Sequence, residues 1–187
     1  MLKRARRVPI RGAVVVITGA GSGIGRLMAH GAANRGAKAV LVWDLNEAAA
    51  RAVAEEIGHA ALAQAVDVTS QESVDAVARE ALARFGRVDV LINSAGIVTG
   101  KDFTNVTEED VERTFAVNTI SHYRTTGAFL PGMLERDRGA IVTIASAAGL
   151  VGVARQADYS PSKFAAVGFA QSLRAELRHR GSRVHTL

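Results

Sequence analysis

Residues 13–25 read AVVVITGAGSGIG, an apolar run that passes directly into a loop with glycine at every second position. The run 13–18 is rich in β-branched residues and apolar on both faces, which predicts a buried parallel strand. The glycines allow a sharp turn, and they let backbone amides and the start of the next helix approach a phosphate group. This stretch therefore predicts a strand–loop–helix unit that can bind an anionic ligand.

The same alternation of strand and helix continues along the chain. Further apolar runs predict strands at 39–43, 62–66, 88–93 and 140–145, and segments of helical period predict helices at 23–35, 46–57, 70–84 and 107–131. Ser70 and Thr107 stand at helix starts as expected N-caps, with acids close behind. The pattern predicts an α/β fold: a doubly wound, Rossmann-type parallel sheet with helices on both faces and its ligand at the carboxyl ends of the strands.

Length and composition favour one domain. The chain has 187 residues, 48% of them apolar, and no repeat or linker marks a second unit. Its net charge of +5 resides in the first eleven residues, where the five basic side chains are Lys3, Arg4, Arg6, Arg7 and Arg11. We therefore expect a basic flexible tail at 1–11 and a single domain at 12–187. A solvated tail is the simplest interpretation, and contact with a membrane surface or an acidic partner is the alternative.

Composition also excludes several classes of protein. Cysteine is absent, which removes disulfides, thiolate metal sites and a thiol nucleophile. No apolar run reaches the roughly 18 residues that a membrane span requires. The five histidines have no metal-ligand spacing, so we expect no metal, and we expect no nucleic acid and a cytoplasmic location.

An acidic residue follows the second strand. Asp44 stands nineteen residues after Gly25, where its carboxylate is placed to hydrogen-bond an adenosine ribose. The alternative is that the glycines only permit a tight turn and that Asp44 caps the next helix. A carboxylate at the ribose would repel a 2′-phosphate, so the sequence favours NAD over NADP.

The segment YSPSK, 159–163, places a tyrosine and a lysine on one face of a predicted helix. A free tyrosine has a pKa of about 10, so using it as a base near neutral pH requires stabilisation of the phenolate. The Lys163 ammonium, one helical turn away, supplies positive charge for this purpose. Ser146, at the end of the fifth strand, is placed to hold a substrate oxygen.

Three motifs occur in order: TGAGSGIG at 18–25, NSAG at 93–96 and YSPSK at 159–163. With them the chain resembles the short-chain dehydrogenase/reductase family over nearly its whole length. The resemblance implies a nicotinamide dinucleotide and a catalytic tetrad, which falls here on Asn118, Ser146, Tyr159 and Lys163. Asn118 would hold a proton-relaying water, with a satisfied core asparagine as the alternative. The implied cofactor contacts are Thr18, Gly19, Ser22, Gly23, Ile24, Gly25, Asp44, Leu45, Asp67, Val68, Asn93, Ala95, Gly96, Tyr159 and Lys163.

Two of these positions carry a reservation. The resemblance places Asp67 and the Val68 backbone at the adenine, whereas a plain helix-capping aspartate is the alternative for Asp67. Ser94 stands where the family more often has a second asparagine, so the hydrogen bond of that amide is in doubt.

Further expectations concern partners and extent. The resemblance implies a homodimer through the helices that carry Asn118 and Tyr159. VLVWDLN and SKFAAVGF look like the family members that act on retinoids, steroids or other lipid alcohols. The chain stops at RVHTL, 183–187, which starts a sixth strand, so we expect a sheet ending there without the family's C-terminal substrate lid and last strand.

The predicted function is therefore that of an oxidoreductase, which transfers a hydride between NAD(H) and a small-molecule alcohol or carbonyl substrate. The alternative is a non-catalytic dinucleotide-binding sensor or scaffold that keeps the fold without turnover.

Overall fold

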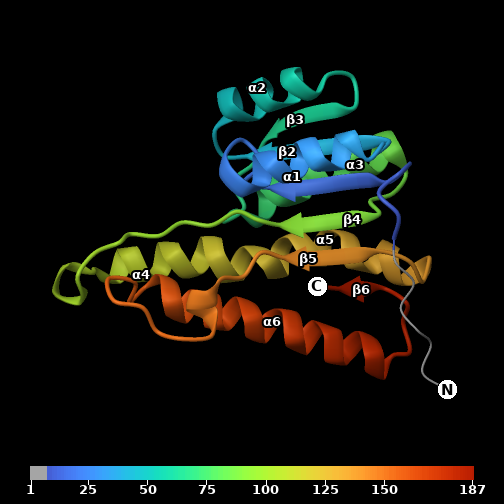
Figure 1. The fold of residues 1–187 in the computed structure, drawn as a ribbon. Helices are drawn as coiled ribbons and strands as arrows, with labels where there is room; N and C mark the ends of the chain where they lie inside the picture. Colours follow the sequence, from blue (N-terminus) through green and yellow to red (C-terminus); the bar gives the residue numbers. More distant parts are fainter. Residues whose placement is uncertain (1–7) are drawn as a thin grey trace.

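A six-stranded parallel sheet forms the centre of the protein (Figure 1). The structure is a computed structural model, and it describes residues 8–187. The strands lie in the order β3-β2-β1-β4-β5-β6. Strands β2 and β3 therefore lie on one side of β1 and strands β4 to β6 on the other, so the strand order reverses between β1 and β4. Their bounds are β1 Val14–Thr18, β2 Ala39–Asp44, β3 Ala61–Ala65, β4 Val90–Asn93, β5 Ala140–Thr143 and β6 His185–Thr186. The predicted doubly wound fold is confirmed.

Helices cover both faces of the sheet. Side chains of α1 and α2 pack on one face, and those of α3, α5 and α6 pack on the other. The helical elements are α1 Gly23–Asn34, α2 Glu47–Ile57, α3 Gln71–Phe85, η1 Phe103–Asn105, α4 Glu108–Phe115, η2 Ala116–Ile120, α5 Ser121–Glu135, η3 Ala147–Gly149 and α6 Tyr159–His179. Ser70 and Thr107 accept the predicted capping hydrogen bonds from Ser73 and Asp110.

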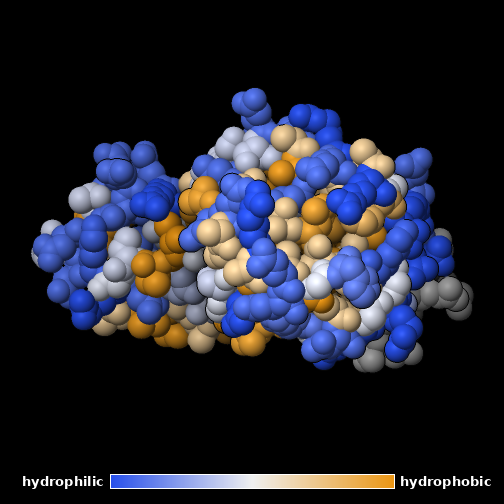
Figure 2. Space-filling model, turned by 90° about the horizontal axis from the view of Figure 1, so that it is seen from above, coloured by the Kyte–Doolittle hydropathy of each residue, from blue (hydrophilic) through white to orange (hydrophobic). Residues whose placement is uncertain are grey.

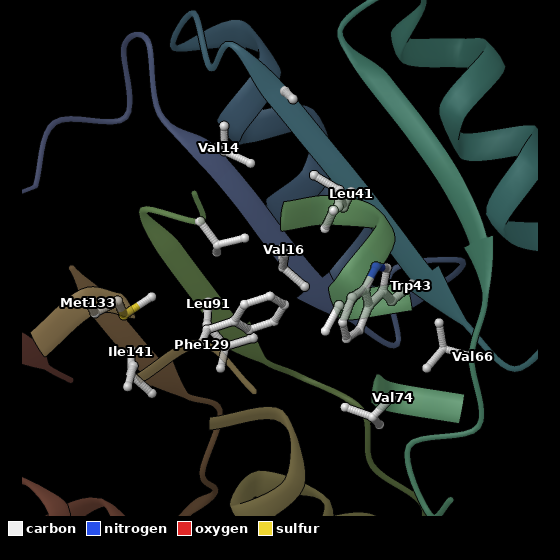
Figure 3. Packing of buried hydrophobic residues seen from close by; sticks show 14 of the residues in the cluster. Val14, Val16, Leu41, Trp43, Val66, Val74, Leu91, Phe129, Met133 and Ile141 are labelled. Atoms are coloured by element: carbon white, nitrogen blue, oxygen red, sulfur yellow. The ribbon is translucent and has the colours of Figure 1, made fainter. Parts of the chain in front are cut away.

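Alternation along the strands divides the core into two layers. Val14 and Val16 of β1 point to the face that also holds Trp43 and Phe129, while the intervening β1 residues join the α1 side. Figure 3 shows the first layer, in which the rings of Trp43 and Phe129 lie 5.7 Å apart between centroids. Because both faces of the sheet are covered at its centre, β1 and β2 are buried over nearly their whole length, as the sequence indicated.

The helix that the sequence predicted over 107–131 has a different end and a less regular interior in the structure. It continues to Glu135 and contains a π-helical turn, η2, between α4 and α5. The prediction ended the helix at Pro131, and that boundary was wrong. Pro131 lies on the exposed side, and the residue four positions before it is Gly127, so the missing hydrogen bond falls at the solvent side of the helix.

The predicted N-terminal tail is only partly within the described residues. Residues 1–7 lie outside them, and Val8 and Ile10 are partly buried against the α1 side of the core. Across residues 8–187, no helix is long and apolar enough to cross a lipid bilayer.

Candidate active site

A cleft of about 610 Å³ lies at the carboxyl ends of the strands. Its walls come from the β1–α1 loop, the ends of β2 and β3, the segment after β4, and the start of α6. In the view of Figure 2, a hydrophilic protrusion stands apart from the main body, and apolar residues gather between them. The cleft lies where the reversal of strand order predicts that a ligand binds.

The glycine loop is shaped by close backbone contacts. Gly19 has a φ of +65°, and a Cβ atom there would lie 2.8 Å from Cα of Ala95. A Cβ on Gly25 would overlap the carbonyl oxygen of Gly19. The loop therefore leads straight into the exposed N-terminus of α1, where unpaired backbone N–H groups can bind a phosphate.

Asp44 ends β2 beside this loop and lines the cleft. Its Oδ2 accepts a hydrogen bond from the Gly21 amide at 2.9 Å, and its Oδ1 accepts one from the Asn46 amide at 2.9 Å. Asn46, rather than Asp44, is the N-cap of α2. The carboxylate is therefore fixed at the edge of the cleft, with part of its surface exposed.

Tyr159 and Lys163 both line the cleft from the first turn of α6. Lys163 is only 4% exposed, and its Nζ donates to the Ile144 carbonyl at 2.9 Å and lies 5.6 Å from the Tyr159 ring centroid. Burial lowers the pKa of the Lys163 ammonium. Among residues 8–187 no carboxylate forms an ion pair with Lys163, so a positive charge on Nζ is not neutralised by a protein anion beside the phenol.

Asn118 lies beneath the cleft, in the π-helical turn η2, and is fully buried. Its Oδ1 accepts from the Ile97 amide at 2.8 Å, and its Nδ2 donates to the Ile97 carbonyl at 2.9 Å and to Ser162 Oγ at 3.0 Å. A Cβ atom on Gly96 would lie 3.4 Å from Asn118 Oδ1 and 3.6 Å from Lys163 Nζ. The amide, the lysine and the segment after β4 thus meet at one point.

Two residues that were predicted to contact the cofactor form hydrogen bonds within the protein and do not line the cleft. Thr18 is buried, and its Oγ1 accepts from the amides of Ser94 and Ala95, each at 3.0 Å. Asn93 is buried as well, and its Oδ1 accepts from Thr125 Oγ1 at 2.7 Å. Both side chains hold the cleft wall in place, and neither lines the cleft.

Ser146 lies at the start of η3, after β5. Its hydroxyl accepts from the Ala148 amide at 3.2 Å, and the residue stands next to Ala145, which lines the cleft. Asp67 lines the cleft with Val68, while its Oδ1 accepts from the amide and hydroxyl of Thr69. Asp67 therefore stabilises the turn before α3 and borders the cleft at the same time.

Most of the predicted contacts do come together. The predicted residues that line the cleft are Gly19, Ser22, Gly23, Ile24, Gly25, Asp44, Leu45, Asp67, Val68, Ala95, Gly96, Tyr159 and Lys163. The sequence prediction missed Arg113 of α4 and Val117 of η2, along with Ile97 and Val98 after β4. Their four-residue spacing puts Arg113 and Val117 on one helix face, but nothing in the sequence shows that this face borders the cleft.

The residues present fit a nicotinamide dinucleotide. Cβ atoms on Gly19, Gly21 or Gly25 would come within 3 Å of protein atoms, so the loop can pass this close to its neighbours only with glycine. The side chain of Ser22, the N-cap of α1, makes no capping hydrogen bond, which leaves the first N–H groups of the helix available to a ligand. Asp44 offers a fixed acceptor for a ribose hydroxyl, and the buried Lys163 retains donors beyond its one bond to Ile144. A cleft of this kind, at the point where the order of parallel strands reverses, is typical of dinucleotide-binding folds.

Comparison with known proteins identifies the family. The family model described as "short chain dehydrogenase" matches residues 13–187, and the chain belongs to this family. It is 44% identical over 177 residues to "Short-chain dehydrogenase/reductase family 16C member 6" of Bos taurus. It is 45% identical over 174 residues to "Epidermal retinol dehydrogenase 2" and 42% identical over 175 residues to "Estradiol 17-beta-dehydrogenase 11", both of Homo sapiens.

These three alignments cover 91–92% of this chain but only 56–58% of the relatives, so the chain spans little more than half of their length. Among solved structures, a short chain dehydrogenase/reductase from Burkholderia phymatum in complex with NAD superposes with a TM-score of 0.91 at 32% identity. That match covers 96% of this chain and 65% of the other. A metagenomic short-chain oxidoreductase in complex with NADP matches with a TM-score of 0.86 at 35% identity, over 95% of this chain and 80% of the other.

Proposed function

We propose that the protein transfers a hydride between NAD(H) and an alcohol or carbonyl substrate, as an NAD-dependent alcohol dehydrogenase or ketoreductase. The observation that carries the proposal is the buried Lys163 ammonium beside Tyr159, in a cleft that also contains the glycine loop and Asp44. When bound, a nicotinamide dinucleotide supplies the hydride acceptor or donor. The chain's own residues bind it, orient the substrate and move the proton.

Tyr159 is the proposed acid–base residue, because its ring stands in the cleft on the helix face of Lys163. The buried Lys163 charge stabilises negative charge on the phenol oxygen, since water does not screen it there. Ser146 would hold the substrate oxygen, which requires its hydroxyl to donate to that oxygen while it accepts from Ala148.

Asn118 is the fourth proposed residue. Its amide is committed to Ile97 and Ser162, so it keeps the lysine and the cleft segment in a fixed relation. Asn118 Oδ1 and Lys163 Nζ both lie close to Gly96, and a water that relays protons between these two side chains is part of the proposal.

The preference for NAD over NADP rests on Asp44. Its carboxylate is held by the amides of Gly21 and Asn46, so it cannot swing away to admit a 2′-phosphate without losing two hydrogen bonds. The neighbouring solved structures include complexes with NAD and with NADP, so fold alone does not decide between them.

For the substrate, we propose a retinoid, a steroid or another lipid alcohol. The support is the similarity to proteins named retinol and estradiol dehydrogenases, together with the exposed apolar side chain of Val98, which lines the cleft. We also propose a homodimer through the helices that carry Asn118 and Tyr159, and a cytoplasmic location.

The test is an activity screen of the protein with NAD and with NADP against retinol, estradiol, a short secondary alcohol and a primary alcohol. The proposal expects cofactor reduction with at least one of them and a preference for NAD.

The second candidate is a dinucleotide-binding sensor without turnover. The observation that favours it is that the Ser146 hydroxyl accepts from the Ala148 amide and that Ser146 is not among the residues that line the cleft. Tight NADH binding with no turnover on any alcohol in the screen would establish that candidate instead.

A further inference from the structure

Asp158, the residue before Tyr159, is a fully buried carboxylate with no cationic partner among residues 8–187. Its Oδ1 accepts from Thr99 Oγ1 at 3.0 Å, and its Oδ2 accepts from Thr114 Oγ1 at 2.8 Å. We call these three residues the Asp158 cluster. A buried carboxylate that is bound only by neutral hydroxyls is uncommon, because desolvation of the charge is costly.

The carboxylate is nevertheless ionised. Burial raises the pKa of Asp158. The hydrogen bonds from Thr114 and Thr99, together with the backbone N–H groups of Asp158 and Tyr159, lower this pKa by more than burial raises it, so the net change is downward. Asp158 also stands at the N-terminus of α6, a helix of 21 residues, where the helix dipole favours negative charge. The site therefore holds a fixed anion that can accept from both hydroxyls at once.

The two hydroxyls belong to two different segments that are next to residues of the cleft wall. Thr99 directly follows Val98 in the segment after β4, whose residues 94–98 line the cleft. Thr114 stands on α4 next to Arg113, which also lines the cleft. Asp158 thus joins two walls of the cleft to the residue that carries the proposed acid–base hydroxyl.

The tether at Thr99 complements the one at Ile97. Asn118 fixes Ile97 by two hydrogen bonds, and Lys101 pairs with Asp110 at 2.6 Å on the outer side of the same segment. Asn118 also links Ile97 to Ser162 of α6, but through its own amide, whereas Thr99 bonds directly to Asp158, the residue that precedes Tyr159. Loss of the Thr99 bond would therefore let the cleft wall move relative to Tyr159 while the rest of the segment stays attached.

We propose that Asp158 is a positioning residue, which holds the segment 94–99 and α4 against the start of α6 and so sets the cleft geometry around Tyr159. This inference rests on the proposed function for its meaning in catalysis. The physical tether itself is independent of any cofactor and can be tested without one.

The test compares Thr99→Val, which keeps the shape and removes the hydroxyl, with Thr99→Ser, which keeps the hydroxyl. Asp158→Ala removes the acceptor for both threonines, and Asp137→Asn is a control, because Asp137 binds Arg183 and Ser182 in another part of the fold. The first readout is amide hydrogen exchange without cofactor, and the second is NADH binding followed by fluorescence.

We expect Thr99→Val to speed exchange in residues 94–99 about tenfold and to weaken NADH binding about threefold or more, while Thr99→Ser stays near wild type. Asp158→Ala should extend the faster exchange to residues 114–117, and Asp137→Asn should change neither readout. If Asp158→Ala does not fold, the comparison of Thr99→Val with Thr99→Ser alone tests the proposal.

The inference is overturned if Thr99→Val keeps wild-type exchange in 94–99, or if Thr99→Ser is impaired as much as Thr99→Val. If the wild-type protein does not bind NADH, the proposed function fails, whereas the exchange data still decide whether the tether exists. Wild-type NADH binding in Thr99→Val, despite faster exchange, would show that the tether does not position the cleft.

Discussion

The side chain of Asn118 bonds both backbone groups of Ile97, accepting from its amide at 2.8 Å and donating to its carbonyl at 2.9 Å. Twenty-one positions separate the two residues, so the pairing joins η2 to the segment after β4. This segment has no regular secondary structure, and the asparagine supplies the hydrogen bonds that a neighbouring strand would otherwise provide.

Asn118→Leu should therefore destabilise the fold as well as the cleft. The leucine has a similar size but leaves both Ile97 groups and Ser162 without these bonds, at a cost of about 2–4 kcal/mol in the free energy of unfolding. Urea denaturation at neutral pH measures it, with Asn105→Ala in the exposed η1 as the control. A loss below about 1 kcal/mol would contradict the structural role assigned to Asn118.

Much of the fold follows from local sequence. The apolar runs fixed the strands because both sheet faces are buried, and Ser70 and Thr107 marked helix starts because their side chains accept from the third helical amide. Asp44 and the glycine loop meet because parallel strands end at the same edge.

The rest depends on contacts between distant segments. No periodicity reveals that Thr99 and Thr114 bond Asp158, or that Arg113 borders the cleft, since these pairings arise only when α4 and α6 pack together. Thr18 and Asn93 were expected at the cofactor, yet their side chains are buried and bond to neighbouring segments. A motif predicts that a residue matters without showing which groups it bonds.

The chain has two tyrosines, which provide a matched pair for testing the proton-transfer role. Tyr159→Phe removes only the cleft hydroxyl and should lower kcat/KM by at least about a hundredfold with the best substrate, while NADH binding persists. Tyr123→Phe is the control, because Tyr123 is 60% exposed on α5 and lies outside the cleft. Near-wild-type turnover by Tyr159→Phe would show that another group transfers the proton.

Asp44→Asn should narrow the preference for NAD. The amide keeps an acceptor for the Gly21 N–H but removes the negative charge that would repel a 2′-phosphate, so the ratio of the two dissociation constants should change about tenfold towards NADP. Fluorescence titrations with NADH and NADPH measure this ratio. Glu47→Gln, a nearby exposed acid outside the cleft lining, should leave it unchanged. An unchanged ratio in Asp44→Asn would remove Asp44 as the selectivity residue.

His122 should make stability depend on pH. It is 1% exposed, neither ring nitrogen has a hydrogen-bond partner, and burial together with the nearby Lys163 charge lowers its pKa from 6.5 to about 4. The folded state therefore favours the neutral ring, and the unfolded state takes up a proton first. This contribution is fully present above the unfolded pKa of 6.5 and is lost as pH falls towards 4, by about 3 kcal/mol in all.

Urea denaturation of the wild type and of His122→Leu, at neutral pH and near pH 5, isolates this contribution. The leucine variant should lose less stability on acidification, whereas His59→Gln, at an exposed position, should match the wild type. Equal pH dependence in His122→Leu and wild type would mean that the folded protein accommodates the charged ring.

Gly25 tests whether the glycine loop is constrained by packing as well as by its ligand. A Cβ there would overlap the Gly19 carbonyl oxygen and lie 3.0 Å from Cα of Ala20, so Gly25→Ala must displace backbone that no side-chain rotation can relieve. We expect a loss of about 2–3 kcal/mol in unfolding free energy without any cofactor, and weaker NADH binding. Gly127→Ala is the control, because that helical site has no atom within 4 Å of the added Cβ and alanine favours a helix by about 1 kcal/mol. Wild-type stability in Gly25→Ala would mean that the loop and α1 can separate freely, and the fixed phosphate-binding geometry would then have no structural basis.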